Sequence, residues 1–338
     1  MVTPADRRTT GPLWSLGALL EETDSLLREG SPAGAAVWPT GFPALDAALT
    51  GGFRSGELVL LGGPAGHGKT TLGLQLARNA VTAGGAAVVF SYEHESHTLL
   101  ERLIAMEAVE RSPGEVAGVV EVRRALERGS GGQSLGALLG ALPGGERAYA
   151  ALVGYGDRLQ IHESSGASTT LGEIESVVSE VTRTTGMAPL VLLDYVQKVP
   201  VDRADQSERI TAAAEGLKEL ALRARVPVVA ISAAEKAALV AGHRMRTHDL
   251  RGSSALAFEA DVVLIVGDKV DIVSREHLVY DLGNVERFRG WTVISIEKNR
   301  HGRARVELEF PKDFEHGRFH LEGNAVHERL IDERVVIS

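Results

Sequence analysis

The feature that most constrains this sequence is GGPAGHGKTT at residues 62–71, which directly follows the apolar run ELVLL at 57–61. The stretch fits the pattern G-x-x-x-x-G-K-[ST] at every fixed position, with a strand expected before it and a helix after it. Glycines in such a loop let backbone N–H groups curl around phosphate oxygens at the positive end of the following helix. The residues expected to form this nucleoside triphosphate site are Gly63, Pro64, Ala65, Gly66, His67, Gly68, Lys69, Thr70 and Thr71.

Hydrolysis of a bound triphosphate would need a cation on the phosphates and ligands for Mg²⁺. Lys69 is expected to place its charge on the β and γ phosphates, and the Thr70 hydroxyl to ligate Mg²⁺. Asp194 ends the apolar run PLVLLD, and an acid there would face the phosphate loop at the edge of a doubly wound sheet. We expect Asp194 to be the second Mg²⁺ ligand; the alternative is an ordinary aspartate at a strand end.

A base that orients the attacking water should come from a neighbouring strand, because such strands deliver residues to the crevice at their carboxyl ends. The run VVFSYEHES offers Glu93 just after the apolar run at 86–91, and Glu95 two residues later. We prefer Glu93 as this base, with Glu95 as the alternative. His67 occupies a variable position of the loop, and we expect it to be tolerated there rather than to act chemically.

Short apolar runs alternate with helical patterns from about residue 40 onward. The runs lie at 57–61, 86–91, 158–161, 189–193, 227–232 and 261–266, and the helical patterns at 70–82, 97–110, 171–185 and 207–225. This alternation predicts an α/β fold with a doubly wound, mostly parallel sheet and helices on both faces. Residues 291–310 read as two strands around a turn, hence a C-terminal β-hairpin. The Gly- and Ala-rich residues 112–156 read as helices joined by a flexible loop.

Composition excludes several classes of protein. The chain has 338 residues and no cysteine, which excludes disulfides, zinc ribbons and thiolate chemistry. No apolar stretch approaches the ~20 residues of a membrane span, and the start MVTPADRRTTGP is no secretory signal. We therefore expect a soluble, cytoplasmic protein without a membrane partner. The net charge of −9 argues against a broadly basic nucleic-acid-binding surface, although it allows a local basic channel.

Residues 13–29 form a predicted amphipathic helix ahead of the α/β region. Five leucines at helical spacing give it one apolar stripe: Leu16, Leu19, Leu20, Leu26 and Leu27. Such a stripe must pack on something. It packs either on its own domain or, across the flexible linker at 30–37, on a neighbouring subunit.

The order of these segments resembles the C-terminal ATPase domain of DnaB-type replicative helicases, within the RecA-like superfamily. The segments that carry the resemblance are TGFPALDAALTGGFRSGELVLLGGPAGHGKTT, FSYEHES, LLDYVQ, VPVVAIS, DLRGSSALAFEADVVLIV and EKNRHGRARVELEF. The resemblance runs from about Thr40 to about Phe319, and 112–156 match only loosely. It implies an N-terminal segment 1–39, a RecA-like ATPase domain at 40–325 and a tail at 326–338. It also implies ATP hydrolysis, with Mg²⁺, between subunits of a ring, usually a hexamer, around single-stranded DNA.

The resemblance also implies roles for individual residues. Glu93 stands where the family has its catalytic glutamate, and Asp194 is the acid of its Walker B strand. Lys298 and Arg300 match the basic pair that a neighbouring subunit inserts against the γ-phosphate, where a guanidinium offsets charge that develops in the transition state. The alternative is two solvated cations on a hairpin.

A loop for nucleic acid is implied in the same way. Arg251 falls in DLRGSS, where the family has a loop that contacts DNA phosphates. Arg244 and Arg246 lie in the same basic cluster, HRMRTHDLR at 243–251, which suits a central channel for single-stranded DNA. The alternative is an ordinary solvated loop.

Several departures from the family pattern limit what the resemblance implies. Ala233 stands where many members carry a glutamine that senses the γ-phosphate, and Gly252 and Ser254 replace the glutamate and glycine of DLRESG. Only about 40 residues precede the ATPase region in this sequence, so we expect the helical N-terminal domain of the replicative proteins to be missing. We therefore expect an accessory helicase or translocase rather than the main replicative one.

Two other functions remain open. A RecA- or KaiC-like regulatory or scaffold ATPase would share the core without helicase activity. The absence of cysteines disfavours a RadA-like protein, and the single phosphate loop disfavours a tandem KaiC-like one. A nucleotide-binding module without turnover would require Glu93 and Arg300 both to be idle.

Overall fold

The computed structural model of the protein describes residues 13–31, 33–112, 114–129, 132–203, 205–235, 243–274, 276–279 and 282–331. The segment 1–12 and residues 332–338 of the expected tail lie outside the described residues. The chain divides into two compact units, Met1–Val37 and Trp38–Ser338. Among the described residues, no helix is long and apolar enough to cross a membrane.

Helix α1 (Leu16–Arg28) belongs to the first unit. It begins at Ser15, whose Oγ accepts a hydrogen bond from the backbone N–H of Ala18 at 3.1 Å and so caps the first turn. Within this unit none of the helix residues is buried. The helix agrees with the prediction for 13–29, whereas the partner of its apolar stripe stays a prediction.

The second unit is built on one large sheet. Its described strands run in the order β11-β10-β9-β8-β3-β7-β6-β4-β5, with β12 beside β10. The strands are β3 (Leu58–Gly62), β4 (Ala86–Ser91), β5 (Leu159–Glu163), β6 (Pro189–Asp194), β7 (Val228–Ile231), β8 (Val262–Asp268), β9 (Trp291–Asn299), β10 (Val306–Asp313), β11 (Arg318–Phe319) and β12 (Asn324–Ala325). Strands β3 to β8 pair in parallel, whereas β8–β9 and β9–β10 are antiparallel. Outside this sheet lie β1 (Val37–Trp38) and β2 (Phe53–Arg54).

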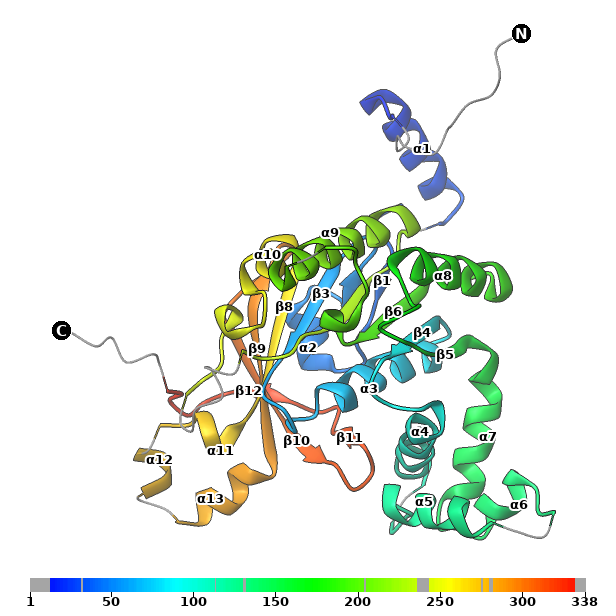
Figure 1. Ribbon diagram of the computed structural model, residues 1–338, viewed down its shortest axis with the longest axis vertical. Helices are drawn as coiled ribbons and strands as arrows, with labels where there is room; N and C mark the ends of the chain where they lie inside the picture. The colour runs from blue at the N-terminus through cyan, green and yellow to red at the C-terminus, as the bar shows by residue number, and fades with distance from the viewer. Residues whose placement is uncertain are drawn as a thin grey trace. The chain divides into compact units, whose positions relative to one another are not determined.

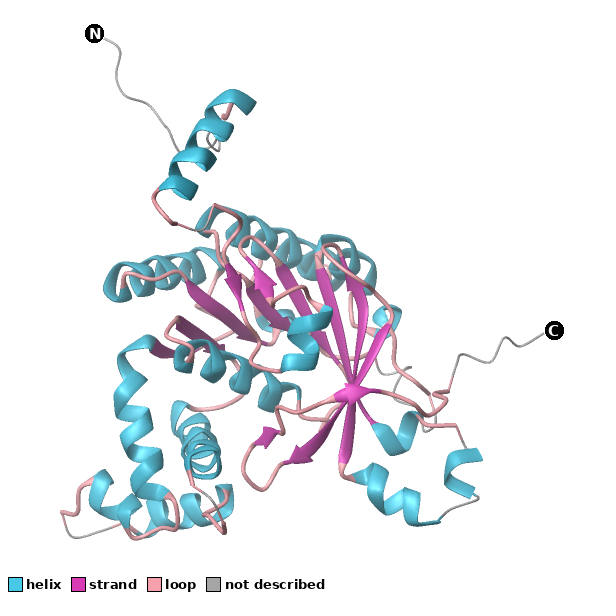
Figure 2. Cartoon of the chain, turned by 180° about the vertical axis from the view of Figure 1, so that it is seen from behind, coloured by secondary structure: helices cyan, strands magenta, loops and turns pink. Residues whose placement is uncertain are grey.

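Helices cover both faces of this sheet (Figures 1 and 2). The described helices of this unit are α2 (Pro43–Ala48), α3 (Lys69–Thr82), α4 (Ser96–Arg111), α5 (Val119–Arg128), α6 (Leu135–Gly140), α7 (Gly145–Tyr155), α8 (Leu171–Thr185), α9 (Gln206–Ala224), α10 (Ser253–Glu259), α11 (Lys269–Ile272), α12 (Glu276–Val279) and α13 (Leu282–Arg289). The figures show α3 on one face, and α8 and α9 on the other. The predicted α/β fold with a mostly parallel sheet and a C-terminal hairpin is confirmed.

Double coverage explains the apolar runs in the sequence. In β3, Val59 and Leu61 share a core with α3, while Leu58 and Leu60 share another with α8 and α9. Because both faces of the central strands are buried, these strands read as continuous apolar runs rather than as alternating ones. Every residue of the strand before the phosphate loop is therefore buried.

Two regions contain elements or packing that the sequence analysis did not predict. Residues 112–156 form α5, α6 and α7, which pack with α4 around a small core of their own that includes Ile104, Val122 and Leu139. The connection between β8 and β9 carries three short helices, α11 to α13. Their packing involves Ile272 and Phe288, both buried.

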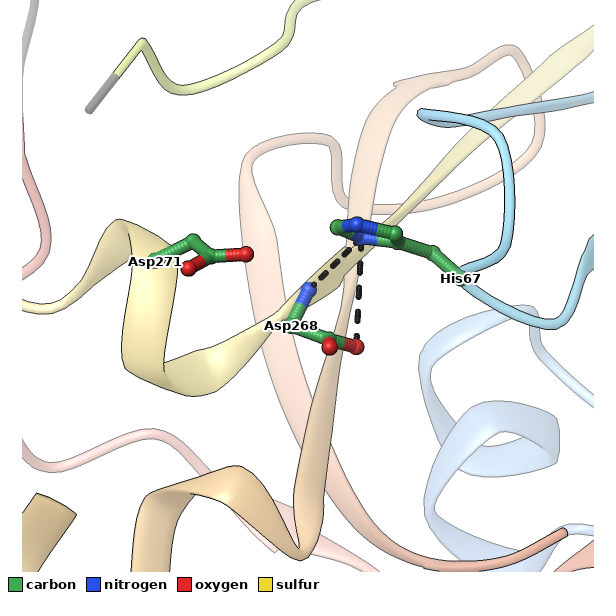
Figure 3. A group of neighbouring side chains, drawn as sticks. All are labelled: His67, Asp268 and Asp271. Carbon is green, nitrogen blue, oxygen red and sulfur yellow. Dashed lines mark hydrogen bonds and ion pairs between the residues drawn. The ribbon is translucent and has the colours of Figure 1, made fainter. Parts of the chain in front are cut away.

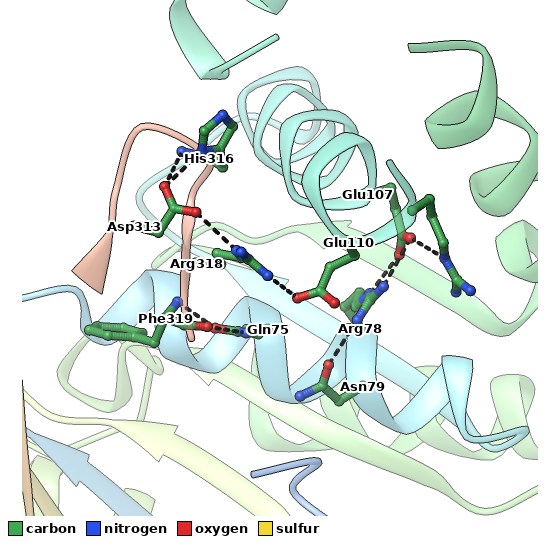
Figure 4. Close-up of polar contacts among 10 residues, drawn as sticks. Gln75, Arg78, Asn79, Glu107, Glu110, Asp313, His316, Arg318 and Phe319 are labelled. Atoms are coloured by element: carbon green, nitrogen blue, oxygen red, sulfur yellow. Dashed lines mark hydrogen bonds and ion pairs between the residues drawn. The ribbon is translucent and has the colours of Figure 1, made fainter. Parts of the chain in front are cut away.

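A polar network ties helix α3 to its surroundings (Figure 4). The Gln75 side chain donates to the Phe319 carbonyl and accepts from the Phe319 N–H, both at 2.8 Å. Arg78 donates two hydrogen bonds to the Glu107 carboxylate on α4, at 2.6 and 2.9 Å. These bonds fix the helix that follows the phosphate loop against both α4 and strand β11.

Candidate active site

The phosphate loop joins the end of β3 to the start of α3. Gly63, Gly66 and Gly68 have φ values of 149°, 82° and 87°, in the left-handed region that favours glycine. At Gly63 a Cβ would also lie only 2.4 Å from the Val266 carbonyl oxygen. All three glycines are thus needed for conformation, and Gly63 and Gly68 are needed for space as well.

Lys69 lies at the first position of α3 and bends back over the loop. Its Nζ donates hydrogen bonds to the carbonyls of Gly63 and Pro64, each at 2.8 Å. Burial lowers the pKa of Lys69, and the nearby carboxylates of Asp194 and Glu93 act in the opposite direction. The ammonium group is therefore held inside the loop, close to two acids.

Thr70 and Asp194 meet although they are far apart in the sequence. The Thr70 hydroxyl donates to Asp194 Oδ2 at 2.6 Å, and Asp194 is 3% exposed. Burial raises the pKa of Asp194, while the Thr70 hydrogen bond and the nearby His94, Lys69 and Arg102 lower it. A carboxylate and a hydroxyl side by side form the oxygen donor set that Mg²⁺ prefers, so these two residues fit a magnesium ion.

A cavity of about 460 Å³ opens beside the loop. It is lined by Gly63, Ala65, Gly66, Gly68, Lys69, Thr70, Thr71, Glu93, His94, Arg102, Asp194, Tyr195, Ile231, Ala233 and Ala234. Glu93 lines this cavity, whereas Glu95 precedes the first turn of α4 and is not among the lining residues. The geometry therefore favours Glu93 over Glu95 as the base.

Two lining residues were missed by the sequence analysis. Arg102 projects from α4 into the cavity, and burial lowers its pKa while Asp194 raises it. His94 lies beside the acids, because ligand atoms of Glu93, His94 and Asp194 all fall within 4.8 Å of one another. Burial lowers the pKa of His94, as does the charge of Arg102. The sequence could have indicated both residues, because His94 directly follows Glu93 and Arg102 lies on the helix that comes next in the chain.

Lys298 and Arg300 lie near the amino-terminal ends of the parallel strands, whereas the phosphate loop lies at their carboxyl-terminal ends. Asn299 pairs with Val262 at the start of β8. Three residues later in β8, Ile265 pairs with Gly62 at the end of β3. Along a strand that separation is about 10 Å, before the loop itself is added. The basic pair therefore approaches the amino ends of the parallel strands, and neither residue lines the nucleotide cavity of its own chain.

Local contacts hold this basic pair in place. Lys298 Nζ donates to the Ala257 carbonyl at 2.7 Å, and Arg300 donates to the Phe258 carbonyl at 2.9 Å. Arg300 also pairs with Asp261 at 3.2 Å, and its side chain is 46% exposed. Burial and the neighbouring Arg300 lower the pKa of Lys298. Phe258 itself is 74% exposed, so an aromatic ring stands in solvent beside the pair.

Gln197 connects the nucleotide site to the loop of Arg251. Its side chain donates to Ser232 Oγ at 2.9 Å and to the Arg251 carbonyl at 3.1 Å, and accepts from the Ala233 N–H at 3.2 Å. The Arg251 N–H in turn donates to the Ala233 carbonyl at 2.9 Å. Gln197 lies three residues after Asp194, and its side-chain amide thus joins the ends of β6 and β7 to the predicted DNA loop.

The other two arginines of the basic cluster are engaged inside the protein. Arg244 is 6% exposed and pairs with Glu307, with a further hydrogen bond to Ser295 at 3.3 Å. Arg246 pairs with Glu297 at 2.7 Å. The phosphate contacts predicted for Arg244 and Arg246 would therefore require these ion pairs to open.

The chain is similar to known proteins over most of its length. The model for the family described as "DnaB-like helicase C terminal domain" matches residues 38–115 and 151–319. Replicative DNA helicase DnaB of Haemophilus influenzae is 27% identical over 328 residues, which is 92% of this chain and 62% of that protein. The same protein of Pasteurella multocida is 27% identical over 323 residues, with the same coverage. The chain thus spans 62% of the length of these curated relatives.

Solved structures share the fold. A DnaB-like replicative helicase, solved to show its interactions with primase, superposes with a TM-score of 0.70 at 20% sequence identity. That match covers 89% of this chain and 67% of the other one. A second solved structure, an isolated ATPase domain, gives the same TM-score and identity, and covers 90% of this chain and 99% of its own. The RecA-like α/β fold expected from the sequence is confirmed by this likeness.

Proposed function

The chain belongs to the DnaB-like helicase C-terminal domain family, and from that premise we propose that it is a ring-forming ATPase that hydrolyses ATP and acts on single-stranded DNA. One observation carries the proposal. One cavity is lined by Lys69, Thr70, Asp194 and Glu93. Arg300 lies instead toward the amino-terminal ends of the parallel strands, away from this cavity. The site is therefore complete only when a second copy supplies its basic pair.

The chemistry follows from the positions of these side chains. Lys69 binds the β and γ phosphates, and Glu93 accepts a proton from the water that attacks the γ-phosphate. Thr70 and Asp194 would hold Mg²⁺, which would neutralise charge on the phosphate oxygens. Arg102 adds a second cation beside the phosphates from helix α4.

Assembly is part of the proposed reaction. Arg300 of one copy would approach the γ-phosphate of its neighbour, and Phe258 would be covered by the same contact. A head-to-tail contact of this kind closes into a ring when the rotation between copies is regular. We propose a homo-hexamer, with residues 40–325 as the ATPase domain and with 1–39 and 326–338 as flanking segments.

Single-stranded DNA would bind through the loop of Arg251. The Gln197 amide joins this loop to the ends of two strands that border the nucleotide cavity. We propose that this link takes the place of the sensor glutamine that Ala233 replaces. The altered loop with Gly252 favours an accessory translocase or helicase over the main replicative enzyme.

A RecA- or KaiC-like regulatory ATPase is the second candidate. Ala233 and Gly252 favour it, since both weaken the part of the pattern that concerns DNA. The two functions share the ATPase site and differ in the response to DNA. The deciding experiment measures ATP turnover at low salt with and without single-stranded oligonucleotides, together with the native mass. Stimulation that Arg251→Ala abolishes supports the translocase; turnover indifferent to DNA supports the regulatory ATPase.

The shared site is tested by mixing variants. An arginine supplied in trans contributes roughly 10³-fold or more to turnover in related chemistry, so Arg300→Ala alone should be almost inactive. In an equal mixture with Glu93→Ala, about a quarter of the interfaces regain both intact halves, so turnover should partly return. A mixture of Glu93→Ala with Lys69→Ala is the matched control, because both changes damage the same half. Absence of rescue in the first mixture, with native mass unchanged, would reject the shared site.

A further inference from the structure

His67 is engaged outside the nucleotide cavity. It stands in the middle of the phosphate loop but is not among the residues that line the cavity. Its Nδ1 accepts a hydrogen bond from the backbone N–H of Asp268 at 3.1 Å and lies 3.8 Å from Asp268 Oδ1. Since Nδ1 accepts this bond, an ion at Nδ1 would have to replace it, and an ion at Nε2 would require the ring proton to move to Nδ1. The sequence analysis treated this residue as merely tolerated.

Asp268 presents a carboxylate oxygen without a partner. It ends strand β8, and its Oδ2 pairs with Lys312 Nζ at 2.9 Å. Its Oδ1 is buried and has no hydrogen-bond partner among the described residues. A buried, unsatisfied carboxylate oxygen is costly, and a bound ion or water molecule at this position would remove the cost.

Asp271 completes a group of three. It lies on the short helix α11 and is exposed, and its carboxylate points toward the His67 ring (Figure 3). The ligand atoms of His67, Asp268 and Asp271 all lie within 4.8 Å of one another. One imidazole and two carboxylates form a donor set that suits divalent transition metals such as Zn²⁺, Co²⁺ and Mn²⁺ better than Mg²⁺, which prefers oxygen alone.

We propose that His67, Asp268 and Asp271 bind a divalent transition-metal ion at a second site, separate from the one formed by Thr70 and Asp194. The two carboxylate charges of Asp268 and Asp271 match the charge of a divalent ion, while Lys312 stays paired with Asp268 Oδ2. The exposed side of Asp271 gives an ion a path from solvent. An ion bound there would tie the middle of the phosphate loop to the insertion that begins with α11.

The site can be tested by direct binding of Co²⁺ to the full chain, without nucleotide. The background is a His94→Ala/Asp194→Asn variant, which removes two donors from the cluster in the nucleotide cavity. We expect one Co²⁺ per chain, with visible absorption bands that show nitrogen and oxygen ligation and that excess Mg²⁺ does not remove. Adding Asp271→Asn should weaken Co²⁺ binding by at least about tenfold, since even changes behind the ligands have that effect.

Two further variants make the result decisive. His67→Asn should abolish the nitrogen contribution to the Co²⁺ spectrum, whereas His320→Asn, an exposed histidine in neither cluster, should leave the spectrum unchanged. Asp271 lies outside the phosphate loop, so its variant separates loss of a ligand from damage to the loop. If the background binds no Co²⁺, or if Asp271→Asn binds Co²⁺ as tightly as the background, the proposed site is wrong. ATP turnover does not enter this measurement, so its outcome is independent of the proposed function.

Discussion

The buried pair between Arg78 and Glu107 allows a quantitative prediction about stability. The two side chains are 6% and 0% exposed, and two hydrogen bonds join them. Burial alone would raise the pKa of Glu107, but the bonds from Arg78, Tyr155 and Arg111 lower it instead. Glu107 is therefore ionised at neutral pH inside the protein, and Arg78 is the main reason that this is tolerated.

Replacing Arg78 with methionine keeps most of the buried volume and removes the charge. Glu107 would keep the hydrogen bonds from Tyr155 and from the half-exposed Arg111, but losing the buried partner of an ion pair still costs about 3–5 kcal/mol of unfolding free energy at pH 7. At roughly 2 °C per kcal/mol for a chain of this size, the melting temperature should fall by about 6–10 °C in calorimetry. Arg183→Met is the matched control: Arg183 also pairs with a glutamate, Glu180, but both side chains are exposed, so little or no shift is expected.

The pH dependence tests the electrostatic explanation. In the native protein the lowered pKa of Glu107 gives stability that is present above the unfolded pKa of glutamate, about 4.3, and lost as the pH falls through the folded value. In Arg78→Met the burial effect dominates, the pKa of Glu107 rises, and protonation relieves the penalty. The difference in melting temperature should therefore shrink between pH 7 and pH 5.

A second change provides the sharpest check. Arg78→Met/Glu107→Met replaces the whole pair with apolar side chains and should recover much of the lost stability. An equal loss at pH 7 and pH 5, together with a double variant as unstable as the single one, would refute the electrostatic explanation. It would assign the effect of Arg78 to packing alone.

Two further predictions concern the site. Gly63→Ala should greatly weaken binding of a fluorescent ATP analogue, because its Cβ would lie 2.4 Å from the Val266 carbonyl; Gly84→Ala, also at positive φ but with nothing within 4 Å, is the control and should bind normally. Gln197→Leu should reduce the ratio of DNA-stimulated to basal ATP turnover, since it removes the hydrogen bonds to Ala233 and Arg251. A stimulation ratio equal to that of the unaltered protein would show that this amide does not link the two sites.

The sequence by itself determined the fold class and the centre of the site. The G-x-x-x-x-G-K-[ST] pattern acts over a few residues, so the path of the loop and the position of Lys69 follow from local conformation. Asp194 and Glu93 were predictable for a related reason. In a doubly wound sheet, residues that follow neighbouring parallel strands must arrive at the same edge. Apolar runs and turn residues carry that information without any knowledge of the packing.

Tertiary structure alone decided which distant residues meet. His67 and Asp268 are 201 positions apart in the chain, and nothing near either one predicts that they touch. The internal ion pairs of Arg244 and the link from Gln197 to Arg251 likewise depend on the packing of separate elements. The position of Arg300 near the amino-terminal ends of the parallel strands follows from the antiparallel register of β9 with β8. Local patterns reflect backbone preference and burial, whereas these contacts depend on strand register and on the three-dimensional path of the whole chain.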